Sequence, residues 1–112
     1  MADPQQPPPP LELEGSSWQL VEIRDVADSV FVPNNPEDYL IRFRGESRMQ
    51  IEADCNQAGA TWSQAGTELS LSQFFSTRAM CPPPSLFNRY VMHLERVNAF
   101  EQSGERLILR SA

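Results

Sequence analysis

Lysine is absent from the chain, and arginine supplies all nine of its Lys or Arg side chains. Chemistry that needs an amine side chain, such as a Schiff base or a phosphate-loop lysine, is therefore excluded. His93 is the only histidine, so one chain cannot assemble a multi-histidine or a carboxylate–histidine metal site. The five glycines never fall into the G-x-G-x-x-G spacing, which excludes dinucleotide binding through that loop.

The sequence also lacks a long apolar run and an excess of positive charge. No stretch approaches the roughly 20 apolar residues that span a bilayer. No basic segment followed by an apolar run marks a signal peptide in the sequence as given. Fifteen acidic side chains against nine basic ones give a formal net charge of -6, and the arginines are spread along the chain. Nucleic acid is therefore not an expected partner.

What the sequence does contain fits one small domain preceded by a proline-rich segment. Of the 112 residues, 40% are hydrophobic, which is enough for one core. Residues 1–10 include four successive prolines, which favour an extended polyproline II conformation. We interpret residues 1–10 as a disordered tether of the kind that links a processed N-terminus or lipid anchor to a folded domain. An ordinary disordered tail has the same composition.

From residue 11 the pattern changes to short runs of alternating apolar and polar residues, which is typical of antiparallel strands with one buried face. The predicted strands cover about residues 17–23, 39–44, 48–54, 58–63, 68–72, 98–102 and 106–110. An irregular acidic loop, rich in turn-forming residues, is expected between the first two strands.

One segment has helical periodicity instead. After Cys81 and three prolines, apolar residues recur at helical intervals from Leu86 to Val97 and gather on one side of a helical wheel. Ser85 is a candidate cap, and the helix is expected to begin between Pro83 and Leu86. The predicted fold class is therefore mainly β (α+β), with one helix packed against antiparallel strands.

Four short motifs occur in an order that resembles the META/HslJ-type domain family. They are Leu13-x-Gly15-x-x-Trp18, Cys55-Asn56-x-x-Gly59, Thr77-x-x-Met80-Cys81 and a terminal Gly104-x-x-Leu107-x-Leu109. The resemblance assigns residues 11–112 to one domain of this kind. The family usually has glycine where this chain has Asp54, so a left-handed backbone at residue 54, which glycine favours, is not expected.

The resemblance implies a fold, a compartment and a function. The fold is a curved antiparallel sheet or partly open barrel with one helix packed against it. Proteins of this family occur in the bacterial envelope or are secreted, some are connected with stress, and none has an established catalytic reaction. The implied function is a non-catalytic envelope domain, periplasmic or lipoprotein-like, that acts as a binding or structural module connected with envelope stress.

Two other functions stay open. The implied shape is similar to that of pilotin-type lipoproteins, which suggests a carrier or chaperone of a hydrophobic peptide or lipid in a cleft between sheet and helix. A small enzyme that uses Cys55 or Cys81 with His93 would need a free cysteine beside an imidazole. No cofactor is expected, and the expected partner is an envelope protein or a hydrophobic ligand. The expected location is periplasmic or secreted, with a lipid anchor on the precursor left open.

Three interpretations compete for Cys55 and Cys81. The tether and the resemblance point to an oxidising compartment, which favours a disulfide worth roughly 3 to 4 kcal/mol by chain-entropy arithmetic. Two reduced, buried cysteines are the second interpretation. The third is a reactive thiol or a metal site. Against it, the carboxylate of Asp54 disfavours a thiolate at Cys55, and the spacing to His93 lacks the close ligand pairs of zinc sites.

Other titratable side chains give weaker signals. His93 lies at the margin of the apolar stripe of the helix, where a half-buried boundary residue is the expected role. No catalytic partner for it is identifiable by spacing, so no catalytic residue is assigned. The carboxylates of Asp25, Asp28, Glu37 and Asp38 lack the spacing of a calcium loop, so a solvated acidic loop is expected rather than a metal site.

Most aromatic side chains are expected to form the core between sheet and helix. Phe74 and Phe75 are adjacent on an extended segment, so their side chains must point to opposite faces. We therefore predict a candidate ligand cleft at the mouth between the helix and the sheet, near Phe74, Phe75 and Tyr90.

Overall fold

A computed structural model describes residues 12–111, and within that range the chain consists mostly of strands with one α-helix. Its elements are β1 (Ser17–Gln19), β2 (Ile23–Arg24), β3 (Val30–Phe31), the short 3-10 helix η1 (Pro36–Asp38), β4 (Tyr39–Phe43), β5 (Arg48–Ala53), β6 (Asn56–Ala65), β7 (Glu68–Ser76), α1 (Phe87–Leu94), β8 (Val97–Ser103) and β9 (Arg106–Ser111). The predicted tether, residues 1–10, lies outside the described residues.

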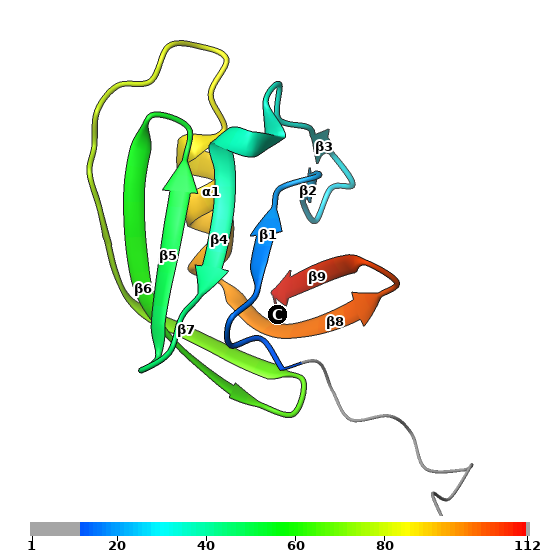
Figure 1. Ribbon diagram of the computed structural model, residues 1–112. Coiled ribbons are helices and arrows are strands. Elements are labelled where there is room, and N and C mark those ends of the chain that lie inside the picture. Colours follow the sequence, from blue (N-terminus) through cyan, green and yellow to red (C-terminus); the bar gives the residue numbers. More distant parts are fainter. Residues whose placement is uncertain (1–11, 112) are drawn as a thin grey trace, which may run out of the picture.

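Seven of the described strands form one antiparallel sheet in the order β1-β4-β5-β6-β7-β8-β9. The sheet curls into a nearly closed barrel with one unsealed seam, between its end strands β1 and β9 (Figure 1). The mainly β fold with a partly open barrel and one helix, expected from the sequence, is therefore confirmed.

The alternating residues of the central strands explain why they pair. In β4 and β5 the buried residues alternate with more exposed ones. The register places Ile41 opposite Ile51 and Phe43 opposite Met49, so apolar pairs line the inner face of the barrel. Within this core the Phe43 and Trp62 rings meet edge to face, with centroids 5.2 Å apart.

Helix α1 packs its apolar stripe against the same core. Phe87, Tyr90 and Leu94 are buried, at the spacing that puts residues on one face of a helix. Val97, predicted to extend the stripe, instead begins β8, because the Arg96 amide donates to the His93 carbonyl in a tighter turn that ends the helix. No helix among residues 12–111 is long and apolar enough to cross a membrane.

Strand β7 is longer than predicted because a β-bulge interrupts its alternation. The register with β6 shifts between Gly59 and Thr61, and Gln73 has a positive φ of 54°. The extra residue leaves Phe74 half-buried against the core and turns Phe75 outward. Phe74 and Phe75 therefore point to opposite faces, as predicted, although the strand runs on past the residue where its sequence pattern ends.

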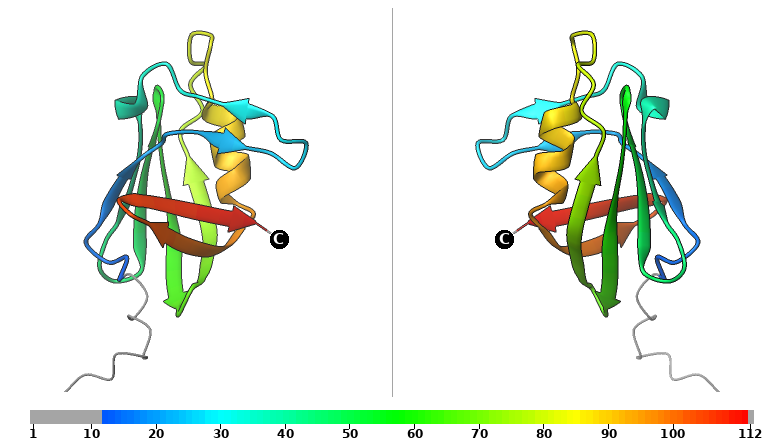
Figure 2. Two further views of the ribbon diagram at one scale, coloured as in Figure 1. Left: turned by 90° about the vertical axis from the view of Figure 1, so that its right-hand side faces the viewer. Right: turned by 90° about the vertical axis from the view of Figure 1, so that its left-hand side faces the viewer.

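The predicted acidic loop after β1 is not wholly irregular, because β2 and β3 pair as a small hairpin outside the main sheet. Ile23 lies opposite Phe31 in this hairpin, and Ile23 is buried. The Arg89 guanidinium of α1 lies 3.7 Å from the centroid of the Phe31 ring, which connects the hairpin to the helix. Figure 2 shows the hairpin crossing beside α1.

Candidate functional site

A disulfide joins Cys55, in the turn between β5 and β6, to Cys81, in the segment between β7 and α1. The Cα atoms of the two residues lie 5.5 Å apart, and no cysteine among the described residues is free. Of the three interpretations of the cysteines, the structure therefore contains the disulfide. The other two require unbonded thiols, which neither cysteine has.

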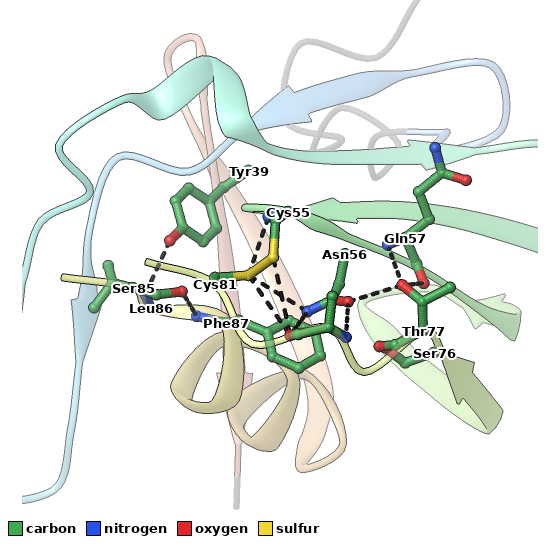
Figure 3. Close-up of a disulfide and its surroundings, with 11 residues drawn as sticks. Tyr39, Cys55, Asn56, Gln57, Ser76, Thr77, Cys81, Ser85, Leu86 and Phe87 are labelled. Atoms are coloured by element: carbon green, nitrogen blue, oxygen red, sulfur yellow. Dashed lines mark hydrogen bonds between the residues drawn. A yellow bond between two sulfur atoms is a disulfide. The ribbon is translucent and has the colours of Figure 1, made fainter. Parts of the chain in front are cut away.

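Asn56 lies next to this disulfide, and it is the buried polar residue of the core in the described part of the chain, with 1% of its surface exposed. Its amide uses both ends, as Figure 3 shows. The Nδ2 group donates to the Ala79 carbonyl (3.0 Å), and Oδ1 accepts from the Ala79 amide (2.7 Å) and from the Thr77 hydroxyl (2.9 Å). Asn56 thus substitutes for a neighbouring strand and satisfies the backbone of Ala79.

Thr77 continues the ladder at the start of the same segment. Its hydroxyl accepts from the Gln57 amide (3.0 Å) while donating to Asn56, and its own amide donates to the Gln57 carbonyl (2.9 Å). The Cys55 amide donates to Cys81 Sγ at 3.2 Å. Three adjacent residues, 55–57 in the turn before β6 and at its start, therefore bind residues 77, 79 and 81 of the opposite segment.

The far end of this segment is held by the barrel. The Leu86 amide donates to the Tyr39 hydroxyl of β4 at 2.8 Å. The Ser85 hydroxyl accepts from the Phe87 amide at 3.2 Å, but the N-cap residue is Leu86 and not the predicted Ser85, so the helix begins at Phe87, just after the predicted range. We call residues 77–86 the pinned loop. Three sets of contacts hold its start, middle and end: the hydrogen bonds of Asn56, the disulfide and the hydrogen bond to the Tyr39 hydroxyl.

Asp54 corrects one expectation from the sequence. Its φ is 57°, so the backbone is left-handed there despite the absence of glycine. A two-residue turn between antiparallel strands favours positive φ, and aspartate tolerates that region better than most residues do. The Asp54 amide also donates to the Asp38 carbonyl at 2.8 Å, which supports this conformation.

Gly15 and Trp18 fix the entry of the chain into β1. Gly15 has a φ of 86°, and its amide donates to the Phe43 carbonyl at 2.7 Å. The Trp18 Nε1 group donates to the Ser16 hydroxyl at 2.7 Å, and Trp18 pairs with Ile41 in the sheet. Both residues have structural roles where the chain enters β1, an end strand of the sheet.

Gly59 and Phe75 form a cross-strand pair in which the ring covers the glycine. A Cβ atom at residue 59 would lie 2.4 Å from the Phe75 ring, so only glycine fits beneath the ring as it stands. Phe75 is 70% exposed, yet it has this definite contact.

Met80 differs from the other residues of its motif. It is 97% exposed, although the residues on both sides of it are fixed by Asn56 and by the disulfide. The motif residues Thr77 and Cys81 thus act within the fold, whereas the Met80 side chain packs against nothing in it.

The three residues of the predicted ligand cleft do not surround one opening. Tyr90 is buried, with its ring edge-on to Tyr39 at a centroid distance of 5.6 Å, and this burial raises the pKa of the Tyr90 phenol. Phe74 is half-buried and Phe75 faces the opposite side. Two open surface grooves, one where β7 and β8 diverge and one beside Trp62, are lined by other residues.

His93 lies on α1, and its Nε2 atom is buried with no hydrogen-bond partner. Neither sulfur that could pair with it is a thiol. Among residues 12–111, no group of three histidine, cysteine, aspartate or glutamate side chains is placed to hold a metal ion. The contacts around the disulfide fix the backbone of residues 77–81.

Sequence reasoning found the residues of this cluster but not what each one contacts. The contacts of Asn56 with Ala79 join strand β6 to the pinned loop and follow no local spacing. Nothing in the sequence indicates the hydrogen bond between the Tyr39 hydroxyl and the Leu86 amide, because an apolar-patterned tyrosine on a strand is predicted only to be part of the core.

The comparisons agree with the resemblance that the motifs carry. A family model described as META domain matches residues 11–112. Searches of curated proteins and of solved structures give no significant match.

Proposed function

The chain belongs to the META domain family, and from this premise we propose that it is a non-catalytic domain of the bacterial cell envelope that acts as a binding or structural module in an oxidising compartment. Periplasmic or secreted location, a lipid anchor on the precursor and a connection with envelope stress are parts of the same proposal. They rest on the family resemblance.

The observation that carries the proposal is the disulfide at the centre of the pinned loop. Disulfides persist in the periplasm and outside the cell, and cytosolic reductants keep most thiols reduced. Here the bond is integrated with the hydrogen bonds of Asn56, since Cys81 Sγ accepts from the Cys55 amide (3.2 Å) and from Asn56 Nδ2 (3.5 Å). Because the loop is held partly by this disulfide, we infer that the protein folds in a compartment where disulfides form.

The non-catalytic part of the proposal is supported by the same cluster. A thiol–imidazole enzyme would need an accessible thiolate and an accessible base. Cys55 and Cys81 are bonded to each other, and Nε2 of His93 is buried without a partner. We make no second proposal of a hydrophobic carrier, because Tyr90 occupies the space between the helix and β4.

The test is an intact mass of protein purified from its native compartment without reductant. Thiols are alkylated before analysis, and a second sample is reduced first. We expect no alkylation of the untreated protein and, after reduction, the addition of two alkyl groups. A Cys55→Ser/Cys81→Ser variant prepared in parallel controls for other sites of alkylation. Two free thiols in the untreated protein would contradict the proposal.

A further inference from the structure

The β2–β3 hairpin and the residues beside it expose an unusual amount of apolar side chain. Seven large hydrophobic residues are exposed in the described part of the chain, and four of them fall within residues 21–32. These four are Val21 (56% exposed), Val26 (103%), Val30 (46%) and Val32 (63%). Exposed apolar side chains scattered singly need no explanation, but a concentration in one small element does.

The inner side of the hairpin is already used by the fold. Ile23 is buried, and Phe31 lies under the Arg89 guanidinium of α1. Because side chains alternate along a strand, Val30 and Val32 point away from the side that Phe31 presents to the helix. The valines are therefore not part of the contact that holds the hairpin on the barrel.

Val26 occupies the apex of a well-formed turn. The Asp28 amide donates to the Asp25 carbonyl (3.0 Å), and the Asp25 carboxylate accepts from the Ala27 (2.9 Å) and Ser29 (3.0 Å) amides. Asp28 has a φ of 62°, the left-handed conformation that closes three-residue hairpins. The hydrogen bonds of Asp25 and Asp28 thus close the turn, and the Val26 side chain within it is fully exposed.

Neither turn chemistry nor solvation accounts for a valine at this apex. Turns favour Gly, Pro, Asn, Asp and Ser, and a branched apolar side chain gains nothing in water. A residue that breaks a local rule with no compensating contact in the fold points to a contact outside it. The fixed backbone lowers the entropy that such a contact would cost.

The charged side chains around the valines indicate which charge a partner's surface should carry. Asp25 and Asp28 flank Val26, and within residues 12–111 neither forms an ion pair with an arginine. Arg24 lies opposite Val30 in the hairpin, but it is paired with Glu22 at 3.3 Å. A second copy in symmetric contact would bring the same carboxylates face to face, in a chain whose net charge is already -6. Complementarity instead favours a positively charged surface.

We propose that Val26, Val30 and Val32, with Asp25 and Asp28, form a docking surface for a protein segment whose contact face carries apolar side chains flanked by arginine or lysine. The valines pack against the apolar side chains, and the two carboxylates meet the basic ones. This inference goes beyond the proposed function and is independent of the compartment, because the hairpin contains no cysteine.

The probe for this surface is a short synthetic peptide of alternating leucine and arginine, titrated into the oxidised, isotope-labelled domain while amide chemical shifts are recorded. We expect saturable shifts concentrated in residues 21–32. An otherwise identical peptide of leucine and glutamate should cause none. The triple variant Val26→Ser, Val30→Thr, Val32→Thr should raise the Kd by about tenfold or more.

Met80→Ser is the matched control, because Met80 is exposed to nearly the same degree as Val26 but lies on the pinned loop. We expect this variant to bind the basic peptide as the parent does, and thermal unfolding to be near-identical for all the proteins. Absence of saturable binding would overturn the proposal, as would shifts spread over the acidic surface with no dependence on the valines. Self-association of the domain through residues 21–32 would also overturn it, in favour of a second copy.

Discussion

The pinned loop and the β2–β3 hairpin lie toward the same end of the barrel in Figure 1, yet they use their side chains in opposite ways. In the pinned loop, polar side chains and a disulfide hold the backbone in place. The buried side-chain amide of Asn56 bonds to both the carbonyl and the amide of Ala79. In the hairpin, the turn is held by Asp25, and apolar side chains are left in water. The side chains around the pinned loop therefore stabilise the fold, whereas the hairpin valines are not part of the contacts that hold the hairpin on the barrel.

The comparison teaches that exposure alone does not identify a docking surface. Phe75 is 70% exposed, but its ring covers Gly59 and so belongs to the fold. Val26 is fully exposed and covers nothing. The difference predicts that substitutions will lower the free energy of unfolding most at the disulfide and least at the hairpin valine.

The largest effect is expected from removing the disulfide. Cys55→Ser/Cys81→Ser should lower the free energy of unfolding by about 3 kcal/mol, because the bond closes a loop of 26 residues in the unfolded chain. For a domain of this size the Tm should fall by about 10 °C or more. Thermal unfolding without reductant measures the change, and a Tm within a few degrees of the parent would show that the hydrogen bonds alone pin the loop.

The next effect is expected from Asn56→Asp, which keeps the shape and removes the donor to the Ala79 carbonyl. We expect a loss of about 2 to 3 kcal/mol at neutral pH, since a buried carboxylate would face a carbonyl oxygen. Burial should raise the pKa of the introduced carboxyl in the folded state above its unfolded value. The loss should therefore be recovered as pH falls, when the protonated carboxyl can donate.

Denaturant unfolding of Asn56→Asp and the parent at several pH values measures this effect. Thr77→Val, which removes a hydroxyl of the same network, is the control and introduces no titratable group. A loss for Asn56→Asp that does not change with pH would mean that the Ala79 contact is not the one that matters.

Gly59→Ala should lower the free energy of unfolding by about 1 to 2 kcal/mol, because its Cβ would displace the Phe75 ring. Combining it with Phe75→Leu should recover part of the loss, since the two residues touch. A double-mutant cycle from denaturant unfolding gives the coupling. Additive losses would show that Phe75, like the valines, is exposed without a role in the fold.

The interior beside the pinned loop can be tested through Tyr90. Burial raises the pKa of its phenol, so above the ordinary tyrosine value of about 10 the unfolded chain ionises first. Stability should therefore be fully present below that pH and should fall above it, by about 1 kcal/mol per pH unit. Tyr90→Phe should remove this component, and an unchanged alkaline slope would indicate that water reaches the phenol.

The smallest effect is expected at the hairpin. Val26→Ser should change the free energy of unfolding by no more than about 0.5 kcal/mol, because the Val26 side chain has no contact to lose. Denaturant unfolding measures it against Phe75→Ser, which removes a ring that is also largely exposed, at 70%, but covers Gly59. A loss above about 1 kcal/mol for Val26→Ser would make the hairpin part of the fold and remove the contrast.

Much of the barrel could be predicted from the sequence because its central strands alternate cleanly. Ile41, Phe43 and Ile51 fall on one face by a period of two, and their burial follows. The period fails at Gln73, where the bulge shifts the register, and so the second half of β7 was not predicted. The hairpin was missed because two short strands are hidden among aspartate, proline and asparagine residues that indicate a loop.

The candidate site could be predicted only as a set of residues. Asn56, Thr77 and Cys81 were singled out by the family resemblance, and the disulfide was the favoured pairing of the only two cysteines. That Asn56 satisfies the backbone of Ala79, or that Phe75 shields Gly59, depends on which strands become neighbours. The adjacency of Phe74 and Phe75 led to a predicted cleft that included Tyr90, and Tyr90 is buried in the core.

Native-state hydrogen exchange of individual amides is the most direct test of the contrast between the pinned loop and the hairpin. The Ala79 amide, bonded to Asn56 Oδ1, and the Cys55 amide, bonded to Cys81 Sγ, should exchange only through near-global opening in the oxidised protein. The Ala27 and Ser29 amides of the hairpin turn should exchange through local opening. Equal, fast exchange at Ala79 and at the hairpin would contradict the account, because the loop would then not be pinned.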